Sequence, residues 1–297
     1  MRRFILIPQL KIHNANAMSS PYTIGFPAMT AWLGTIHALQ RKLQTQGFDD
    51  IVLNKIAVSC HQFDLQTYKG QGDFVHSIIG TANPLDKDGN RPAFIEEARC
   101  HLTVSLLIEY KNLDIDEKDN LLTAIYQNIS CMKVASGDVL SLKQPTLLYF
   151  KEDGDDDKQL KPILNKLMLG HLLIERRDLI QESMTKENKD ALDAILDYLK
   201  VTHSANQDEN GKITWIAKRK EIGWLVPISV GFQGISELGQ AKNQRDATTP
   251  HRFAEAIITL GEFIMPYRIK DIDDILWQYH ADIENNLYLC QTHTTHD

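Results

Sequence analysis

Apolar and polar residues alternate along three stretches in the first half of the chain, and this pattern predicts β-strands. The apolar run Phe4–Ile7 has the length of a strand and ends at Pro8. Alternation predicts two more strands, near Lys55–Phe63 and Cys100–Tyr110. On the last of these, the face opposite the apolar positions is polar and carries Arg99, His101, Thr103 and Ser105.

Two further segments have helical spacing. Pro27 suits the first turn of a helix, and apolar positions then recur at intervals of three and four up to about Gly47. Asp116 can cap a second helix, which a short strand near Met132–Val134 follows. Residues 12–25 are rich in Asn, Ser, Pro and Gly, so they are predicted to be a loop.

The resulting order, strand–helix–strand–strand–helix–strand, is that of the ferredoxin-like fold. We therefore predict an α+β chain with a ferredoxin-like (RRM-like) palm over residues 1–150. In that fold both helices cover one face of the sheet, and the other face is free to bind a ligand, as in RNA-recognition modules. Residues 66–95 are polar and too long for a hairpin loop, which predicts a functional projection, the segment that the resemblance described below identifies as a thumb.

The second half begins with an acidic linker at residues 152–157. Amphipathic spacing over residues 158–201 predicts a helical insertion, so we assign residues 151–210 to linker and insertion. Residues 211–297 are expected to complete the body of the palm. They are predicted to contain a strand at Gly223–Val230, a helix from Pro250 to about Ile264 and a strand near Ile275–Tyr279.

Composition narrows the class of protein. The 297 residues are 43% apolar and 24% charged, which is typical of a globular chain and excludes a disordered or collagen-like one. The longest apolar run is far shorter than the roughly 20 residues of a membrane span, and the four cysteines form no CxxC pair. We expect a cytoplasmic protein without membrane contact, metal or cofactor.

The net charge of −7 hides an uneven distribution. Residues 1–48 hold five Lys or Arg and no Asp or Glu, although an even distribution of the 39 acidic residues would place about six there. A carboxylate would repel an anionic partner, so this segment is predicted to face an anion. The alternative is chance combined with a buried strand and helix.

Three groups of residues could carry chemistry. On the first predicted helix, His37 and Arg41 share one stripe and could act as the general base and phosphate clamp of a ribonuclease, or could be an ordinary helix histidine beside an exposed arginine. In the preceding loop, Asn14, Asn16, Ser19 and Ser20 could bind bases and phosphates without adding charge, or could simply form turns.

The third group lies in residues 212–252, which hold seven Lys or Arg and three Asp or Glu. Thr249 and Pro250 resemble a helix start, which would place Arg252 in a first turn. A cation gains nothing from the helix dipole there, so Arg252, with Arg245 nearby, is predicted to bind an external phosphate. The alternative is a solvated basic face.

Several blocks of residues, in order along the chain, resemble the Cas-five-type subunit of type I-F CRISPR surveillance complexes. The resemblance covers most of the chain outside residues 150–210. Its blocks are Asn14–Ala17, Ser19–Pro21, Gly25–Pro27, His37–Arg41, Asn83–Leu85, Asp88–Gly89, Glu96–Glu97, Arg99, His101–Leu102, Val104–Leu107, Gly223–Ile228, Arg245–Asp246, Thr249–Pro250, Arg252–Phe253, Leu260–Glu262, Leu276–Trp277 and His280–Ala281.

The resemblance implies a member of the repeat-associated RNA-binding (RAMP) superfamily. Such a subunit holds the 5′ handle of the CRISPR RNA (crRNA), pairs with the large subunit and caps the filament of backbone subunits, and its thumb contacts the guide and the adjacent backbone subunit. A dedicated endoribonuclease processes the precursor in this subtype, although related subtypes use a Cas-five-type protein for that step. Whether target double-stranded DNA contacts the chain stays open.

We therefore expect an antiviral ribonucleoprotein subunit that is not an enzyme. The expected RNA contacts are Asn14, Asn16, Ser19, Ser20, His37, Arg41, Arg99, Arg245 and Arg252. Two alternatives remain: a metal-independent endoribonuclease that processes repeat RNA with His37 as general base, and a protein adaptor that never touches RNA. Apolar faces on the thumb and insertion predict poor solubility without the large subunit.

Overall fold

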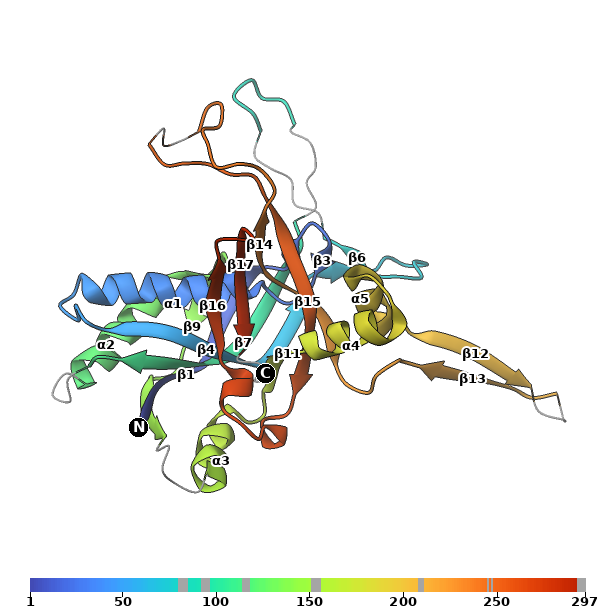
Figure 1. Ribbon diagram of the computed structural model, residues 1–297, viewed down its shortest axis with the longest axis horizontal. Helices are drawn as coiled ribbons and strands as arrows, with labels where there is room; N and C mark the ends of the chain where they lie inside the picture. The colour runs from blue at the N-terminus through green and yellow to red at the C-terminus, as the bar shows by residue number, and fades with distance from the viewer. Residues whose placement is uncertain are drawn as a thin grey trace.

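The computed structural model is organised around one large antiparallel sheet (Figure 1). The α+β class predicted from the sequence is confirmed, with helices α1–α5 among the described residues. None of those helices is long and apolar enough to span a membrane. The structure describes residues 1–79, 85–91, 97–113, 118–150, 156–207, 211–244, 246 and 248–292.

The palm is the part of the sheet formed by the first half of the chain. Its strands lie in the order β9-β1-β7-β4, and each pair is antiparallel. Helices α1 and α2 cover one face. The bounds are β1 (Arg2–Asn16), α1 (Met29–Gln44), β4 (Val52–Leu65), β7 (Arg99–Lys111), α2 (Lys118–Ser130) and β9 (Gly137–Ser141).

Helix α1 forms where its apolar spacing predicts. Pro27 lies just before the helix rather than inside it, and Ala28 is the N-cap. Trp32, Leu33 and Leu39 are fully buried against the sheet, and each such side chain stabilises the fold by about 1.5–3 kcal/mol. Burial of one apolar stripe therefore fixes the helix on the palm.

Strand β1 is longer than predicted, because two irregularities let it continue past Pro8. Gln9 and Asn14 have φ values of 53° and 55°, and the pairing with β7 shifts register at both places. Each bulge takes up polar residues, so Leu10 and Ile12 still point to the core. The predicted loop at residues 12–25 is therefore wrong. It contains the end of β1 and a small hairpin of β2 (Met18–Ser20) and β3 (Thr23–Ile24).

The fourth palm strand also differs from the prediction. The segment near Met132–Val134 is only the short strand β8 (Lys133–Val134), which turns through Ala135 and Ser136, both with positive φ, into β9. It is β9 that pairs with the second half of β1, and β10 (Thr146–Phe150) pairs with the first half. A two-residue turn with two positive φ values is the usual form for a tight hairpin.

The second half of the chain extends the sheet beyond β4. From β4 outwards the order is β16-β17-β14-β15-β11, and β11 pairs with β4 as well, so the strand pairings close a ring. Trp277 lies fully buried in this part and donates from Nε1 to the carbonyl oxygen of Leu173 at 2.9 Å. The strands are β11 (His171–Glu175), β14 (Leu225–Gly234), β15 (Ala254–Ile264), β16 (Trp277–Asp282) and β17 (Leu287–Thr292).

Residues 250–264 were predicted to be a helix, and this prediction is wrong. They contain β15, which pairs with β14 on one side and β11 on the other. Its last six residues are all buried, so the segment lacks the polar stripe of a surface helix. Gly261 lies close against Leu173 and Ile228, where a Cβ would be crowded. Arg252 is consequently not in the first turn of a helix, and the dipole argument for its role fails.

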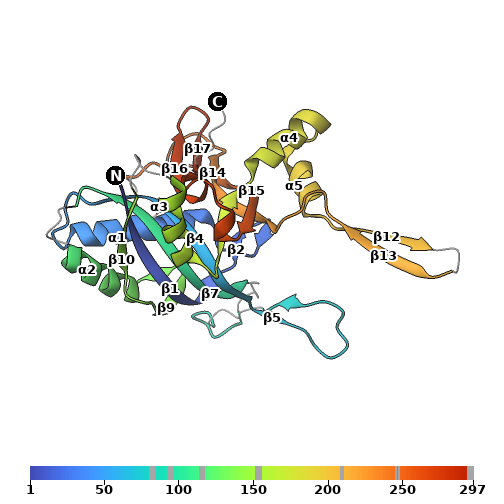
Figure 2. The same ribbon diagram turned by 90° about the horizontal axis from the view of Figure 1, so that it is seen from below.

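The predicted helical insertion contains three helices, but it also supplies β11. Helix α3 lies on the palm face away from α1 and buries its apolar side against Phe4, Leu6 and Leu107 (Figure 2). The second sheet face, expected to be free, is thus covered at the Arg2 end of β1. The helices are α3 (Asp156–Leu167), α4 (Arg177–Glu187) and α5 (Ala191–Leu199). The 3₁₀ turns η2 (Pro266–Arg268) and η3 (Asp273–Ile275) help to cover the same end.

Three segments project from the body (Figures 1 and 2). The predicted thumb contains a hairpin of β5 (Thr67–Tyr68) and β6 (Ser77–Ile78), and its residues 80–84 and 92–95 lie outside the described part. A second hairpin, β12 (Thr202–Gln207) with β13 (Ile213–Lys218), was not predicted. The third projection is the loop of residues 235–253 between β14 and β15.

Candidate nucleic-acid interface

The second face of the palm sheet is left uncovered at the thumb end. We call this area the polar face. It follows from the alternation of the strands, because the neighbouring residues on β1, β4 and β7 point to the helices and are apolar. The polar face is formed by Lys11, His13, His61, His101, Thr103 and Ser105, with Asn14, Gln66 and Lys143 at its border.

A hydrogen-bonded pair lies at the centre of the polar face. Ser105 Oγ lies 2.7 Å from His61 Nε2 and also accepts the backbone N–H of Gln9 at the β1 bulge, at 3.1 Å. Burial and the nearby positive charge of Lys143 lower the pKa of His61. The imidazole of His61 is therefore neutral at pH 7 and contributes hydrogen-bonding groups rather than charge.

Two more histidine rings lie on top of one another beside the thumb. The rings of His13 and His101 are stacked with centroids 4.3 Å apart and an angle of 11°. His101 Nδ1 accepts the backbone N–H of Asn14 at 3.2 Å, and Asn14 Oδ1 accepts from Gln66 Nε2 at 2.6 Å. The thumb root is thereby fixed to the polar face, with a flat aromatic pair next to it.

The polar face carries charges of both signs, because Asp64, the exposed register partner of His101, lies on it as well. Lys11 and Lys143 are exposed, and neither has a carboxylate within 4.0 Å among the residues that the structure describes. Lys133 is paired with Asp138 at 2.6 Å, and Arg99 is paired with Glu97. Lys11 and Lys143 are therefore the cations that can bind an incoming phosphate without first breaking an ion pair.

The structure brings three of the predicted residues together. Asn16 is the register partner of Arg99, and Arg99 donates to the carbonyl oxygen of Asn14 at 3.5 Å. The side chain of Asn16, however, is used within the chain, because it accepts from the N–H of Met18 and donates to the Met18 carbonyl oxygen. Asn14 and Arg99 thus border the polar face directly, while Asn16 shapes the turn beside it.

Ser19 and Ser20 serve the β2–β3 hairpin. Both hydroxyl groups lie within 3.0 Å of Thr23 Oγ1, and Ser20 Oγ also accepts the N–H of Tyr22 at 3.1 Å. Ser20 is buried. Hydrogen bonds within the hairpin account for Ser19 and Ser20 without a ligand. This agrees with the alternative interpretation, in which these residues simply form turns.

The other predicted residues lie elsewhere. His37 and Arg41 are exposed on α1, which covers the opposite face of the sheet and places them at least about 12 Å along the helix from its start. Arg252 contacts Asn286 beside Gly234, at the far end of β14, about 25 Å along that strand from Val226. The sheet therefore separates His37 and Arg41 from Asn14, the role of Arg252 in RNA binding stays a prediction, and Arg245 lies outside the described residues.

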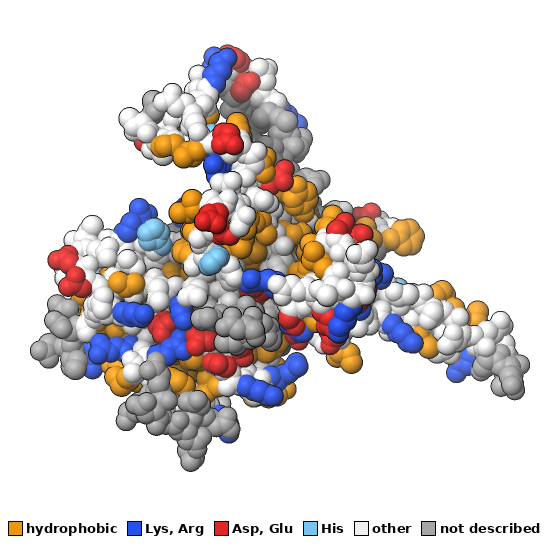
Figure 3. Space-filling model, viewed as in Figure 1, with side chains coloured by type: hydrophobic (Ala, Val, Ile, Leu, Met, Phe, Trp, Pro, Cys, Tyr) orange, Lys and Arg blue, Asp and Glu red, His pale blue; other side chains and the backbone are white. Residues whose placement is uncertain are grey.

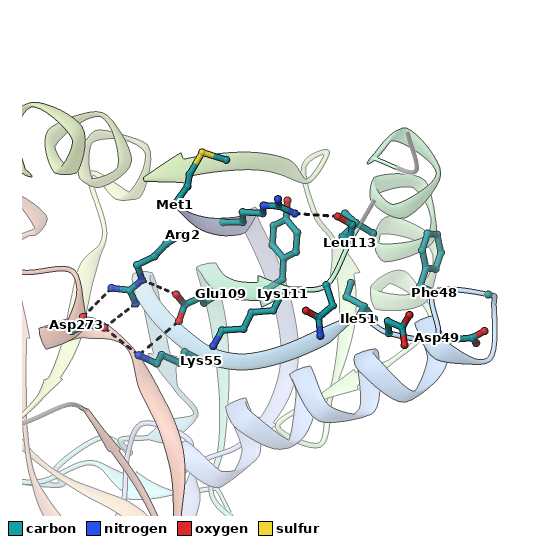
Figure 4. Close-up of a pocket in the computed structure, with 15 residues that line it drawn as sticks. Met1, Arg2, Phe48, Asp49, Ile51, Lys55, Glu109, Lys111, Leu113 and Asp273 are labelled. Atoms are coloured by element: carbon teal, nitrogen blue, oxygen red, sulfur yellow. Dashed lines mark hydrogen bonds and ion pairs between the residues drawn. The ribbon is translucent and has the colours of Figure 1, made fainter. Parts of the chain in front are cut away.

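A larger cavity of about 1210 Å³ opens at the Arg2 end of the palm, and four of the charged side chains that line it form one network (Figure 4). Arg2 donates to Glu109 at 2.6 Å and to both carboxylate oxygens of Asp273 at 2.8 and 2.9 Å. Lys55 lies 3.3 Å from Asp273 and 3.8 Å from Glu109. Two cations balance two anions, so we interpret this network as a structural link between the palm and η3.

Four residues that form or border the polar face were not singled out from the sequence. Lys11, His13 and His61 lie on strands whose full length or facing was not predicted, and Lys143 reaches the face only through the β9 pairing. His101, Thr103 and Ser105 were recognised as a polar strand face. The acid-free stretch of residues 1–48 was the one signal for Lys11.

Comparison with known proteins agrees with the resemblance seen in the sequence. The family model for CRISPR-associated protein Csy2 matches residues 5–290. The CRISPR-associated protein Csy2 of Pseudomonas aeruginosa (strain UCBPP-PA14) is 33% identical over 312 residues, which cover 97% of this chain and 94% of that relative. The match includes both halves of the sheet.

Proposed function

This chain belongs to the Csy2 family of CRISPR-associated proteins, and from that membership we propose that it is a non-catalytic, RNA-binding subunit of a type I-F surveillance complex. Its RNA ligand is the 5′ handle of the crRNA. The observation that carries this proposal is the polar face: a sheet surface with two lysines that no described carboxylate pairs with, neutral hydrogen-bonding groups and stacked aromatic rings.

The palm topology supports the finer assignment to the Cas-five type. The antiparallel order β9-β1-β7-β4, with both helices on one face, has the chain order and strand order of a ferredoxin-like fold. RNA-recognition modules with this architecture bind single strands on the open sheet face. In this chain α3 confines that use to the thumb end.

Binding is proposed to combine two kinds of contact. Lys11 and Lys143 neutralise phosphates, while Asn14 and the histidines bind bases through hydrogen bonds and stacking. Arg99 joins them from the start of β7. A small RNA contact of this kind is compatible with a net charge of −7, because the rest of the surface contacts proteins and does not need to be basic.

The experiment that tests the proposal incubates the full-length chain with end-labelled repeat RNA, without added metal. We expect the RNA to be retained and to stay intact, because no described acid, base or lysine is hydrogen-bonded to the exposed His37. His37→Ala should therefore behave as the wild type.

Two outcomes would contradict the proposal. Cleavage that His37→Ala abolishes would establish the endoribonuclease alternative. Absence of any ultraviolet-induced RNA adduct on this chain in the assembled complex, together with no RNA retention by the chain alone, would identify a protein adaptor.

Partner surfaces are proposed on the projections and on α4–α5. Every residue of β12 is exposed, and a two-stranded hairpin is at best marginally stable in water without support. Figure 3 shows hydrophobic side chains along this hairpin, interspersed with basic ones. Trp215 on β13 is 70% exposed. Phe74 on the thumb is 97% exposed. These surfaces fit the large subunit and the adjacent backbone subunit as partners.

Solubility should depend on those partners. Leu192 and Leu196 were expected to form the buried side of their helix, but Ala194, Ile195 and Tyr198 take that role and leave both leucines exposed. We expect a large part of the chain expressed alone to aggregate and the co-expressed chain to be soluble, so RNA binding by the chain alone is measured on its soluble fraction. Gel filtration of both preparations measures this. The double variant Leu192→Gln, Leu196→Gln should improve solo solubility, whereas Leu169→Gln, elsewhere on the surface, should not. A monodisperse wild-type chain would contradict the prediction.

A further inference from the structure

A second cavity, of about 300 Å³, lies beside the polar face. It is formed where the β2–β3 hairpin and the start of α1 meet β4 and the beginning of β14. No Lys, Arg, Asp or Glu lines it. Six aromatic residues are among those that line it: Phe26, His61, Phe63, His171, Trp224 and Phe263.

The rings are held in fixed positions by contact with one another. Trp224 packs edge-on against His171 with centroids 5.3 Å apart, and it lies 5.2 Å from Phe263. Phe26 contacts Phe263 at 5.2 Å and Phe63 at 6.3 Å. Trp224 is nevertheless 54% exposed, so a large flat ring surface at the cavity remains available for stacking.

Hydrogen-bonding groups line the cavity on the β4 side. Strand β11 pairs with β4 only at Ser59 and Cys60, and beyond Cys60 the outer edge of β4 has no strand partner among the described residues. Every second residue of a strand turns its N–H and C=O to such an edge, so backbone donors and acceptors reach the cavity wall near Gln62. The side chains of His61 and Gln62 add further polar groups.

The cavity shares one residue with the proposed RNA surface. His61 belongs to both, since its ring is bonded to Ser105 on the polar face and also lines the cavity. Neighbouring strands are about 4.8 Å apart, so the lysine of β1 lies only about 10 Å from β4 across the sheet. A strand of RNA bound at Lys11 and Lys143 therefore reaches the cavity within a short distance.

From these features we infer that the cavity holds one unpaired nucleobase of the bound RNA, turned out of the strand and stacked on Trp224. This inference rests on the proposed RNA-binding function. A neutral cavity with aromatic walls, beside a strand edge that no described strand pairs with, suits a heteroaromatic base, which needs stacking together with hydrogen bonds along its rim. It offers no charge for a phosphate, and the edge donors would stay unsatisfied beside an aliphatic side chain.

The test uses the full-length chain and a single-stranded repeat RNA of about ten nucleotides. Trp224→Leu is expected to lower RNA affinity about tenfold or more and to leave the salt dependence unchanged, because stacking contributes no counterion release. Trp215→Leu, a tryptophan 70% exposed on the distant β12–β13 hairpin, is the matched control and should bind as the wild type.

A second arm identifies the base. It uses a series of RNAs in which one position at a time is abasic. For the wild type, the abasic change at one position should lower the affinity. For Trp224→Leu, the same change should lower the affinity no further. Wild-type affinity of Trp224→Leu, or additive losses at every abasic position, would overturn the inference while leaving RNA binding itself intact. Loss of a co-purifying protein with unchanged RNA affinity would assign the cavity to a protein side chain. Failure of the wild-type chain to bind any RNA would instead refute the proposed function.

Discussion

Replacing both Lys11 and Lys143 with glutamine is expected to weaken RNA binding about 25-fold at 0.1 M salt. Each phosphate contact to a single strand contributes roughly 0.7 to the slope of log affinity against log salt concentration. At 0.1 M salt, a tenfold dilution from 1 M, one such contact therefore raises the affinity about fivefold. Both lysines are exposed and lack a carboxylate partner among the described residues. The slope should therefore become shallower by about 1.4, measured by titration of a labelled single-stranded RNA at several salt concentrations.

The matched control is Lys42→Gln. Lys42 is equally exposed, but it lies on α1, the helix that covers the opposite face of the palm. We expect its affinity and salt slope to equal those of the wild type. If Lys42→Gln lowered the slope and the double variant did not, the RNA would lie on the helix side, near the originally predicted Arg41.

Local patterns were sufficient to predict α1, β4 and β7. In each of these elements, the positions that are buried in the structure recur with the period of a helix or a strand. The core residues that they contact either lie close in the sequence or cover one whole face of the element. The polar face of β7 followed from the same alternation. A period of 2 or 3.6 is a property of the sequence itself, so it needs no knowledge of the rest of the fold.

The errors occur where distant segments decide the structure. Strand β15 was predicted to be a helix because its apolar residues do not alternate strictly with polar ones. Only pairing along both of its edges, with β14 and β11, makes an extended conformation favourable. Strand β1 was predicted to end at Pro8, because a bulge can be recognised only when the partner strand β7 is known. Strand β11 was not predicted, because it lies within a segment whose spacing is that of amphipathic helices.

The candidate site was predicted in part for the same reason. Asn14 and Arg99 were singled out separately, and the register of β1 against β7 brings them together. His37 and Arg41 were chosen for residue type and local charge, but they lie on α1, which covers the opposite face of the sheet from the polar face that Asn14 borders. Residue type indicates chemistry, whereas topology decides which residues can act on one ligand.

The second large effect is expected from Glu109→Gln, which should lower the free energy of unfolding by about 3 kcal/mol, or roughly 6–10 °C in Tm. Glu109 is 5% exposed, and with Asp273 it balances the mostly buried Arg2 and Lys55. The variant keeps the shape but leaves two cations facing one carboxylate. Differential scanning calorimetry measures the change, and Asp49→Asn, an exposed acid in the same cavity, should leave Tm unchanged.

Acid titration of stability provides an independent readout of the same network. Burial raises the pKa of Asp273, but hydrogen bonds and positive charge from Arg2, with the charge of Lys55, outweigh it and hold that pKa below its ordinary value. A carboxyl group with a lowered pKa stabilises the fold above the unfolded-state value of about 3.9, and this contribution is lost as pH falls further. Asp273→Asn should therefore be less stable than the wild type at pH 7, and the difference should shrink below about pH 4. A difference that stayed constant down to pH 3 would show that the ion pairs between Arg2, Lys55 and Asp273 do not hold η3 to the palm.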